Sequence, residues 1–334
     1  MRYIKSALIV GLAMLSILIL FFAISKNQQV CTSNYSFEVV GVGEKTDINI
    51  EVYLEERSIA RFSVTDVPLI VDPVQETRCK LYIIRKFSTG VSNDPNRIRY
   101  ELWEYNSEGV GISRLLLLHT NYAEQKQTYD LSISIEQTNN YLGLISRDLL
   151  SSELNNNDAL VIKKLSDLDK DYLIIPLEEI YRTSNIMGSP TLLRWSKDSK
   201  NLWFELSEAA IVNGFGKINV VTKTFEIYKA PDGTMGGDAF NLESSWITYD
   251  PESFWCGEIT CTNDERQDRI RRGMSSELYV YNLITKESIL VESYKPDPLW
   301  YYKPRWISDS VLSYVLPDGT TKRYNVTKKQ HVLE

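Results

Sequence analysis

Histidine is scarce in this chain, which has 334 residues and two histidines, His119 and His331. The sequence therefore predicts neither a histidine-based catalytic triad nor a histidine-rich zinc site. It also lacks the Gly-x-Ser-x-Gly nucleophile elbow of the α/β-hydrolases, because the nearest approach, Gly273–Glu277, has no second glycine. We accordingly predict no catalytic residue, no metal and no cofactor, and the sequence favours a binding protein over an enzyme.

Helical periodicity is also scarce. Outside the N-terminal segment, no long stretch repeats its apolar residues at helical spacing. The chain has 20 Tyr, 7 Trp and 10 Phe, and many segments alternate apolar with polar residues, as half-buried strands do. The predicted fold class is all-β.

Charge is missing between Lys5 and Lys26, and residues 6–25 are long enough to cross about 30 Å of hydrocarbon as a helix. Because Arg2 and Lys5 precede this run, the N-terminus should stay cytoplasmic and the remainder should be exported. We expect a single-pass protein of the cell membrane whose bulk is extracytoplasmic. Its parts are a cytoplasmic stub with signal anchor (1–26), a tether (27–36) and an exported domain (37–330). The alternatives are a signal peptide cleaved near Ala23–Ser25 and a lipoprotein modified at Cys31.

The net charge of the chain is −7, and its first 26 residues contain basic residues but no acidic ones. The exported part therefore carries about −10, without a basic stripe. This argues against nucleic acid or anionic lipid as a partner. Lipid contact is expected through residues 6–25.

The four cysteines all lie on the predicted exported side, where disulfides persist. Cys256 and Cys261 are close in sequence and suit a local disulfide, which would leave Cys31 to pair with Cys79. Free or half-paired thiols are the alternative, because sequence does not fix connectivity.

A repeated unit organises the chain, and its clearest copy is Ser189–Tyr228. It contains an apolar run ending in Arg194-Trp195, a polar turn and three further strands, which make one antiparallel unit. Similar second strands begin at Asn140, Ser245 and Ser310. A lone four-stranded sheet cannot cover both of its faces, so such units stack around an axis.

Two turns carry a family resemblance. Leu193–Lys200 and Pro304–Ser310 resemble the P-x-W-S-P-D-G-K turn of WD40-like repeats in TolB-type periplasmic β-propellers and in prolyl-oligopeptidase-like propellers. Leu278–Leu283 is similar to the strand that follows in those repeats. The match covers residues 189–326, although Ser replaces Gly in both turns and Lys197 stands where Pro is usual. The resemblance implies the propeller fold without the hydrolase domain, and for function only envelope scaffolding or binding.

We therefore predict a β-propeller of about five four-stranded blades over residues 37–330, preceded by one transmembrane helix. Propellers usually close by pairing strands from the two termini, so a segment within Phe37–Val64 should complete the blade that contains Trp306. If this closure is absent, the alternative is a β-sandwich with a smaller propeller-like piece.

Two segments are candidate binding sites. The long insertion Gly257–Ser276 presents arginines to a carboxylate partner, and a Pro-stiffened segment presents aromatic residues to a protein or sugar. The candidate residues are Arg266, Arg269, Arg271, Arg272, Trp300, Tyr301 and Tyr302. The alternatives are a solvated loop whose arginines pair with Glu265 and Asp268, and aromatic residues that fill the gap between blades.

The Asp-x-Asp-x-Asp spacing of Asp167–Asp171 is that of calcium loops, but Tyr172 occupies the position that needs Gly. A polar turn is the simpler interpretation.

The predicted function is a membrane-anchored extracytoplasmic propeller that binds a protein or peptide at one rim. A propeller-fold hydrolase or lyase acting on envelope glycans or peptides is the rival, with Asp238, Glu243 or Glu258 as its acids. A third possibility is a spacer that holds something away from the membrane.

Overall fold

The structure is a computed structural model of the chain. It describes residues 35–40, 47–54, 57–65, 73–77, 80–88, 98–106, 111–120, 128–130, 132–136, 140–147, 158–186, 188–208, 211–234, 240–241, 243–251, 263–295 and 300–332. The predicted anchor and all four cysteines lie outside these residues. Within them, no helix is both long and apolar enough to span a bilayer.

The described strands form six antiparallel sheets, which we number I to VI in chain order. Sheet I contains β1 (Tyr35–Val40), β2 (Asp47–Leu54) and β3 (Arg57–Thr65). Sheet II contains β4 (Pro73–Thr77), β5 (Lys80–Ser88), β6 (Ile98–Asn106) and β7 (Gly111–Thr120). Sheet III contains β8 (Thr128–Tyr129), β9 (Ser134–Ile135), β10 (Tyr141–Arg147), β11 (Ala159–Lys164) and β12 (Asp167–Pro176).

The later sheets have four strands each. Sheet IV contains β13 (Ser189–Trp195), β14 (Asn201–Glu208), β15 (Ile211–Asn219) and β16 (Thr224–Lys229). Sheet V contains β17 (Phe240–Asn241), β18 (Trp246–Tyr249), β19 (Ser276–Asn282) and β20 (Ser288–Tyr294). Sheet VI contains β21 (Arg305–Trp306), β22 (Val311–Val315), β23 (Thr321–Asn325) and β24 (Gln330–His331).

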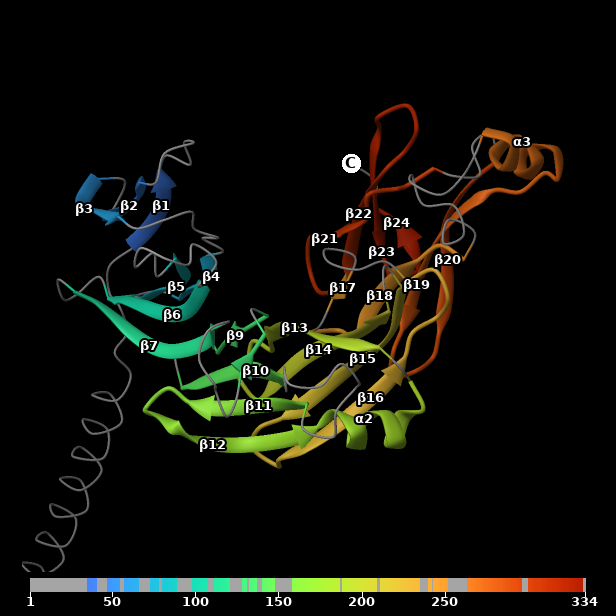
Figure 1. The fold of residues 1–334 in the computed structure, drawn as a ribbon. Coiled ribbons are helices and arrows are strands. Elements are labelled where there is room, and N and C mark those ends of the chain that lie inside the picture. The colour runs from blue at the N-terminus through green and yellow to red at the C-terminus, as the bar shows by residue number, and fades with distance from the viewer. Residues whose placement is uncertain are drawn as a thin grey trace, which may run out of the picture.

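The sheets follow one another around an arc, with sheets I and VI at its two ends (Figure 1). Within each sheet the strands pair in chain order, apart from the split first strand of sheet III. First strands of successive sheets touch one another, as β4 touches β9, β9 touches β13 and β17 touches β21. The predicted all-β architecture of four-stranded antiparallel units is thereby confirmed.

The predicted closure is wrong. Phe37–Val64 lies in sheet I, whereas the sheet that contains Trp306 takes all four strands from the C-terminal part of the chain. The physical reason is that Gln330–His331 already pairs with Tyr324-Asn325 and occupies the position that a terminal strand would fill. The six sheets also exceed the expected five, because β1–β3 pair with one another.

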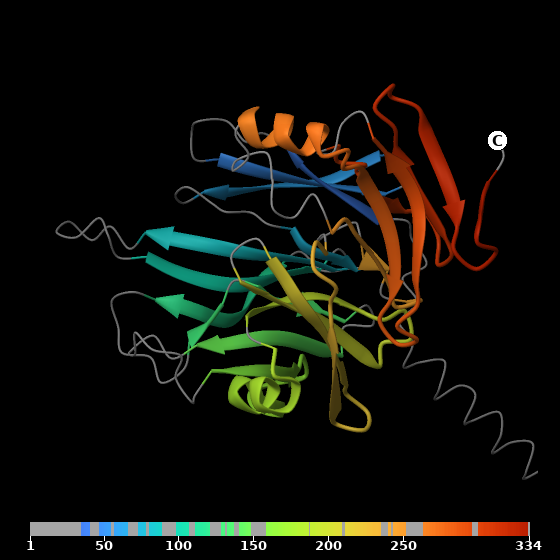
Figure 2. The same cartoon turned by 90° about the vertical axis from the view of Figure 1, so that its right-hand side faces the viewer.

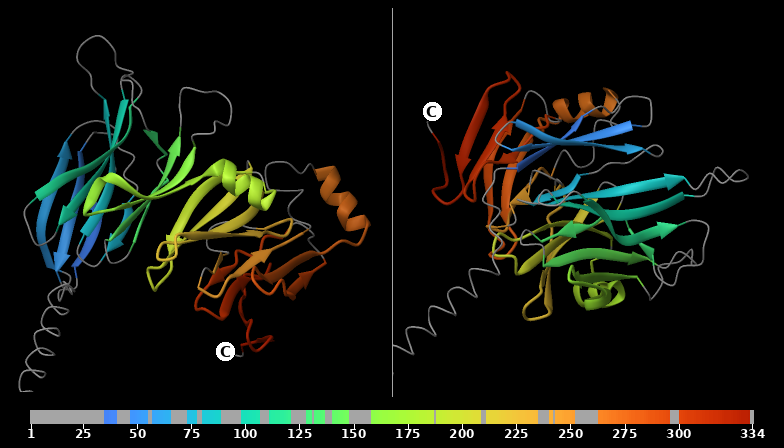
Figure 3. Two further views of the ribbon diagram at one scale, coloured as in Figure 1. Left: turned by 90° about the horizontal axis from the view of Figure 1, so that it is seen from below. Right: turned by 90° about the vertical axis from the view of Figure 1, so that its left-hand side faces the viewer.

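Two short helices were not predicted. α2 (Leu177–Ser184) follows β12, and α3 (Asn263–Arg271) lies in the insertion between β18 and β19. α2 lies beside β12 and β16, whereas α3 lies beyond sheet V (Figures 1 and 2). Both are on the same side of the arc in the left panel of Figure 3. They are too short to show a helical period over three turns, so the sequence pattern missed them.

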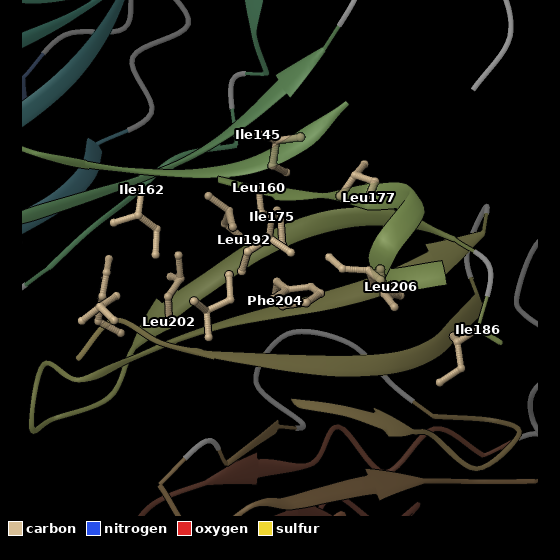
Figure 4. Close-up of a cluster of buried hydrophobic side chains, with 14 residues drawn as sticks. Ile145, Leu160, Ile162, Ile175, Leu177, Ile186, Leu192, Leu202, Phe204 and Leu206 are labelled. Atoms are coloured by element: carbon tan, nitrogen blue, oxygen red, sulfur yellow. The ribbon is translucent and has the colours of Figure 1, made fainter. Parts of the chain in front are cut away.

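The core consists of apolar clusters that each draw on two consecutive sheets. Between sheets III and IV, Ile145, Leu160 and Ile175 face Leu192, Phe204 and Leu206 (Figure 4). Corresponding clusters join II to III, IV to V and V to VI, with buried residues that include Tyr82 with Leu142, Phe215 with Phe240, and Leu278 with Tyr314. Because each fully buried aliphatic side chain contributes about 1.5–3 kcal/mol, these clusters are what hold the arc together.

Trp195 shows why the resembled turn matters for packing. Its side chain is 2% exposed, and its indole N–H donates to the Ser134 carbonyl of sheet III over 3.2 Å. Its ring stacks on Tyr141 with centroids 6.0 Å apart. The aromatic residue at the end of the first strand therefore fastens sheet IV to the preceding sheet.

A second recurring element is the turn between the third and fourth strands of sheets IV, V and VI. Each turn begins with an asparagine, Asn219, Asn282 or Asn325, whose side-chain oxygen accepts backbone N–H groups two or three residues ahead. The next residue, Val220, Leu283 or Val326, is buried and donates its N–H to the first turn of the same sheet. The two turns of each sheet are thus tied together.

The same turns contain a lysine with positive φ: Lys223 (58°), Lys286 (63°) and Lys329 (52°). This conformation is unfavourable for a residue with a Cβ, by roughly 1–2 kcal/mol. All three side chains reach back to the outer strand region of the preceding sheet, at Tyr172, Tyr228 and Glu287 respectively. Each of these lysines therefore connects its own sheet to the sheet before it in the chain.

The asparagine contribution is testable. Asn282→Ala removes two bonds accepted from Ile284 and Thr285 N–H groups and one weak bond to the Ser244 carbonyl. We expect a loss of about 1–2 kcal/mol, measured by thermal unfolding followed through tryptophan fluorescence. Asn325→Ala is the matched control, since its oxygen accepts one such bond, from Lys328. A larger loss in Asn325→Ala than in Asn282→Ala would contradict this account.

Candidate functional site: a groove between sheets IV and V

The predicted arginines lie on or directly after α3. Arg271 and Arg272 are exposed and approach Asp268 at 3.4 and 3.7 Å. Arg269 is half-buried, and Arg266 lies in the first part of α3. These two ion pairs with Asp268 match the alternative given for this insertion, a solvated segment whose arginines pair with its own carboxylates.

The predicted aromatic residues divide between the core and the surface. Tyr302 is fully buried, and its hydroxyl donates to the Ser276 carbonyl over 2.9 Å. The Trp300 indole donates to the Val315 carbonyl over 3.0 Å, and Tyr301 is 46% exposed. Tyr302 and Trp300 thus pack between sheets V and VI, which leaves only Tyr301 at the surface.

Of the three carboxylates considered above, the structure describes one. Asp238 and Glu258 lie outside it, and Glu243 accepts a bond from the Lys197 N–H over 2.8 Å. The calcium-like segment forms the start of β12, where Lys163 pairs with Asp171 at 2.6 Å and Lys170 with Asp167 at 3.3 Å.

A groove of about 310 Å³ lies between sheets IV and V. Its lining residues are Lys229, Ala230, Pro231, Asp232, Tyr281 and Lys286. The first four lie at the end of β16 and directly after it, whereas Tyr281 and Lys286 belong to β19 and the turn after it. The groove therefore exists only when the two sheets are packed together.

One wall is the segment that leaves β16. Gly233 has φ +81°, and a Cβ there would lie 2.1 Å from the Asp250 carbonyl oxygen, so glycine is required. Asp250 N–H donates to the Gly233 carbonyl over 3.0 Å, and the Thr234 hydroxyl donates to the Pro231 carbonyl over 2.6 Å. These bonds fix the backbone that carries Lys229 and Asp232.

Aromatic and charged residues support the groove from sheet IV. The Lys286 ammonium lies 5.6 Å from the centre of the Tyr228 ring. Tyr228 stacks on Trp203 at 6.1 Å, and the Lys217 ammonium lies 5.7 Å from both rings. Lys217 also pairs with Glu226 at 3.0 Å. This cluster fixes Tyr228 beneath Lys286.

The protonation of the cluster follows from these contacts. Hydrogen bonds from Tyr228 and then Lys217 lower the pKa of Glu226. Burial alone would lower the pKa of Lys217, but its bonds to Glu226 and Tyr228 raise it overall. Burial and the bond to Glu226 raise the pKa of Tyr228. At neutral pH the cluster therefore contains a stable carboxylate–ammonium pair.

The groove itself carries excess positive charge. Lys229 and Lys286 are exposed, and among the residues that the structure describes neither has an ion-pair partner. Asp232 is the single acidic residue in the lining. A basic groove on a chain of net charge −7 is a local concentration of cations, which favours binding of an anionic group.

A tyrosine ledge, which we define as Tyr249, Tyr279 and Tyr281, continues the groove along sheet V. Tyr249 stacks on Tyr279 at 5.0 Å and meets Tyr281 edge-on at 6.3 Å. The Tyr279 hydroxyl donates to Glu277 over 2.7 Å, and this bond raises the pKa of Tyr279 to about 12. All three residues are half-buried, so part of each remains exposed to solvent.

Sequence reasoning missed this groove. The Pro-Asp-Gly segment 231–233 has the composition of a turn, and Tyr281 occupies an ordinary alternating strand. No local pattern shows that these two segments meet across neighbouring sheets. The lysine that ends the Asn282–Lys286 turn is the one usable signal, because the same pattern recurs at Asn219–Lys223.

The Glu226 pair generates a prediction about pH. Because the folded-state pKa lies below its ordinary value of 4.5, Glu226 stabilises the fold above that pH, and the benefit is lost as the pH falls through the lowered pKa. Glu226→Gln should lower stability at pH 7 by about 0.5 kcal/mol, because the side chain is largely exposed. Thermal unfolding should show the variant and wild type converging in acid. Exposed Glu208→Gln is the control, and a deficit that persists at low pH would contradict the assignment.

No family model and no curated protein matches this chain. Among solved structures, TolB from Acinetobacter baumannii is similar at 7% identity and a TM-score of 0.41, covering 90% of this chain and 63% of its own. The β-propeller domain of Swd1 from Myceliophteria thermophila is similar at 10% identity and 0.46, covering 88% and 80%. A prolyl endopeptidase is similar at 12% identity and a TM-score of 0.43, covering 87% of this chain and 37% of its own. TolB and the prolyl endopeptidase carry the names of the two propeller groups that the turns at Leu193–Lys200 and Pro304–Ser310 resemble.

Proposed function

We propose that this chain is a membrane-anchored extracytoplasmic binding module whose groove between sheets IV and V holds an acidic segment of a partner protein. The observation that carries the proposal is the pair of exposed lysines, Lys229 and Lys286, on either side of the groove without an ion-pair partner among the described residues. Together with one opposing carboxylate, Asp232, they leave the groove positive.

The dimensions favour part of a polypeptide over a whole small ligand. A volume of about 310 Å³ is at the lower end of the range for small-molecule pockets, and this groove is open to solvent on one side. It accommodates one or two acidic side chains, and the tyrosine ledge extends the contact surface beside it. Tyrosine rings suit a protein interface because they bury large area with little loss of conformational freedom.

The position at the membrane is supported by the sequence. The apolar run 6–25 with Arg2 and Lys5 before it is the pattern of a single-pass anchor with an exported domain. The net negative charge of the exported domain would repel an anionic partner over most of its surface. Such a partner could bind only where the local charge is positive. The groove is such a place.

The binding test uses the full-length chain in neutral detergent micelles and fluorescence anisotropy. The probe is fluorescein-labelled decaglutamate, and decaglutamine is its uncharged match. Wild type should bind decaglutamate and not decaglutamine, and Lys229→Gln/Lys286→Gln should weaken binding about fivefold, since two solvent-exposed pairs are lost. The effect should shrink at high salt.

Lys295→Gln/Lys303→Gln is the control, because it removes two charges from exposed lysines, and Lys295 follows the end of β20 that is far from Lys286. Equal binding of both peptides, or an unchanged affinity in the double variant, would contradict the proposed function.

A further inference from the structure

The turn that positions Lys286 recurs one sheet earlier and creates a similar arrangement. Lys223 has the same positive φ, and its ammonium lies 4.3 Å from the centre of the Tyr172 ring on β12. It also donates to the Tyr172 carbonyl at 3.5 Å. Each lysine thus lies over a tyrosine of the preceding sheet's outer strand, Tyr172 in one case and Tyr228 in the other.

A second cation approaches Tyr172. The Lys164 ammonium, at the end of β11, lies 4.9 Å from the same ring centre. Both lysines are exposed, whereas Tyr172 is half-buried and its hydroxyl donates to the Val220 carbonyl over 3.2 Å. Lys164 and Lys223 with Tyr172 are called the second lysine–tyrosine site below.

Three carboxylates lie at the start of β12, and two of them are paired with lysines outside this site, whereas the third, Asp169, is exposed and is not paired with Lys164 or Lys223. Asp171 is held by Lys163 at 2.6 Å, and Asp167 by Lys170 at 3.3 Å. In the described part of the chain, Lys164 and Lys223 therefore have no carboxylate partner. A tyrosine ring attracts each ammonium but does not cancel its charge, so two like charges remain together at the surface.

The third copy of the turn shows that this excess charge is not a requirement of the fold. Lys329 occupies the corresponding position in sheet VI and pairs with Glu287 at 2.6 Å. The turn therefore tolerates a neutralising carboxylate, and two of its three copies leave the cation available.

Strand β16 connects the two sites. Lys223 immediately precedes its first residue, Thr224, and its last residue, Lys229, lies in the groove. The strand has 6 residues, which corresponds to about 20 Å in extended conformation. The one acidic side chain on it, Glu226, is engaged by Lys217 and Tyr228. α2 packs beside β16 in the cluster that Phe225 and Ile227 join, whereas Thr224 and Glu226 are exposed on the alternate face of the strand. A single extended acidic segment can reach both sites along that exposed face.

We propose that Lys164, Lys223 and Tyr172 form a second carboxylate-binding site, and that the acidic partner segment spans both sites along β16. This inference rests on the proposed function of the groove and adds the length and charge spacing of its partner. The segment carries acidic groups about 20 Å apart, which is roughly six or seven extended residues.

The test compares a short and a long labelled probe on the full-length chain in neutral detergent. Triglutamate reaches one site only, whereas decaglutamate is long enough to occupy both. In wild type, decaglutamate should bind far more tightly than triglutamate, because its second contact is intramolecular. In Lys164→Gln/Lys223→Gln, that advantage should fall about fivefold or more. Lys295→Gln/Lys303→Gln is again the control for the loss of two lysine charges elsewhere.

The two proposals fail separately. If Lys164→Gln/Lys223→Gln leaves decaglutamate affinity unchanged while Lys229→Gln/Lys286→Gln weakens it, the second site is overturned and the groove stands. If neither double variant changes the affinity, both proposals are overturned. Equal losses in Lys295→Gln/Lys303→Gln and Lys164→Gln/Lys223→Gln would reduce the effect to net charge and also overturn the second site.

Discussion

The turn between the third and fourth strands joins each later sheet to the one before it, and the site depends on that junction. An asparagine oxygen closes the turn, a buried Val or Leu ties it to the first turn of the same sheet, and a lysine with positive φ reaches back over the preceding outer strand. The positive φ directs the lysine side chain toward the preceding sheet, so its ammonium group lies beside the side chain that this sheet places there. At Tyr172 and Tyr228 it meets an aromatic ring, and at Glu287 a carboxylate.

Packing between consecutive sheets supplies the stability on which those contacts rest. Each apolar cluster takes residues from two sheets, as Phe215 of sheet IV stacks on Phe240 of sheet V with centroids 4.2 Å apart. Such stacked rings stabilise beyond the area they bury. The groove lies at the edge of the cluster between sheets IV and V. Sheet IV supports one of its sides and sheet V the other, and the groove is open to solvent. A site of this kind is preorganised for an extended partner.

The repeating four-stranded unit could be predicted from the sequence, but the way in which the sheets pack and close could not. Trp195 and the Ser196–Lys200 turn follow the propeller pattern because local hydrogen bonding and burial of one ring determine them. The closure was wrong because the pairing of Gln330–His331 with β23 depends on two residues with no strand signal of their own. The groove was missed for a related reason: Lys229 and Tyr281 meet only through the packing of separate sheets. The burial of Tyr302 between sheets V and VI corresponds to the packing role that the sequence offered as the alternative to a binding site.

The most direct test of the account is a map of where an acidic peptide lies on the folded chain. Carbodiimide-activated carboxyl groups of decaglutamate form amide bonds with the deprotonated ε-amines of lysines that the peptide contacts, and the carbodiimide leaves as its urea. Peptide mass mapping identifies the linked lysines. The account predicts cross-links concentrated at Lys229 and Lys286, with Lys164 and Lys223 next, and few at Lys197, which is exposed and paired with Asp309. Cross-links spread evenly over the exposed lysines, or absent from Lys229 and Lys286, would contradict it.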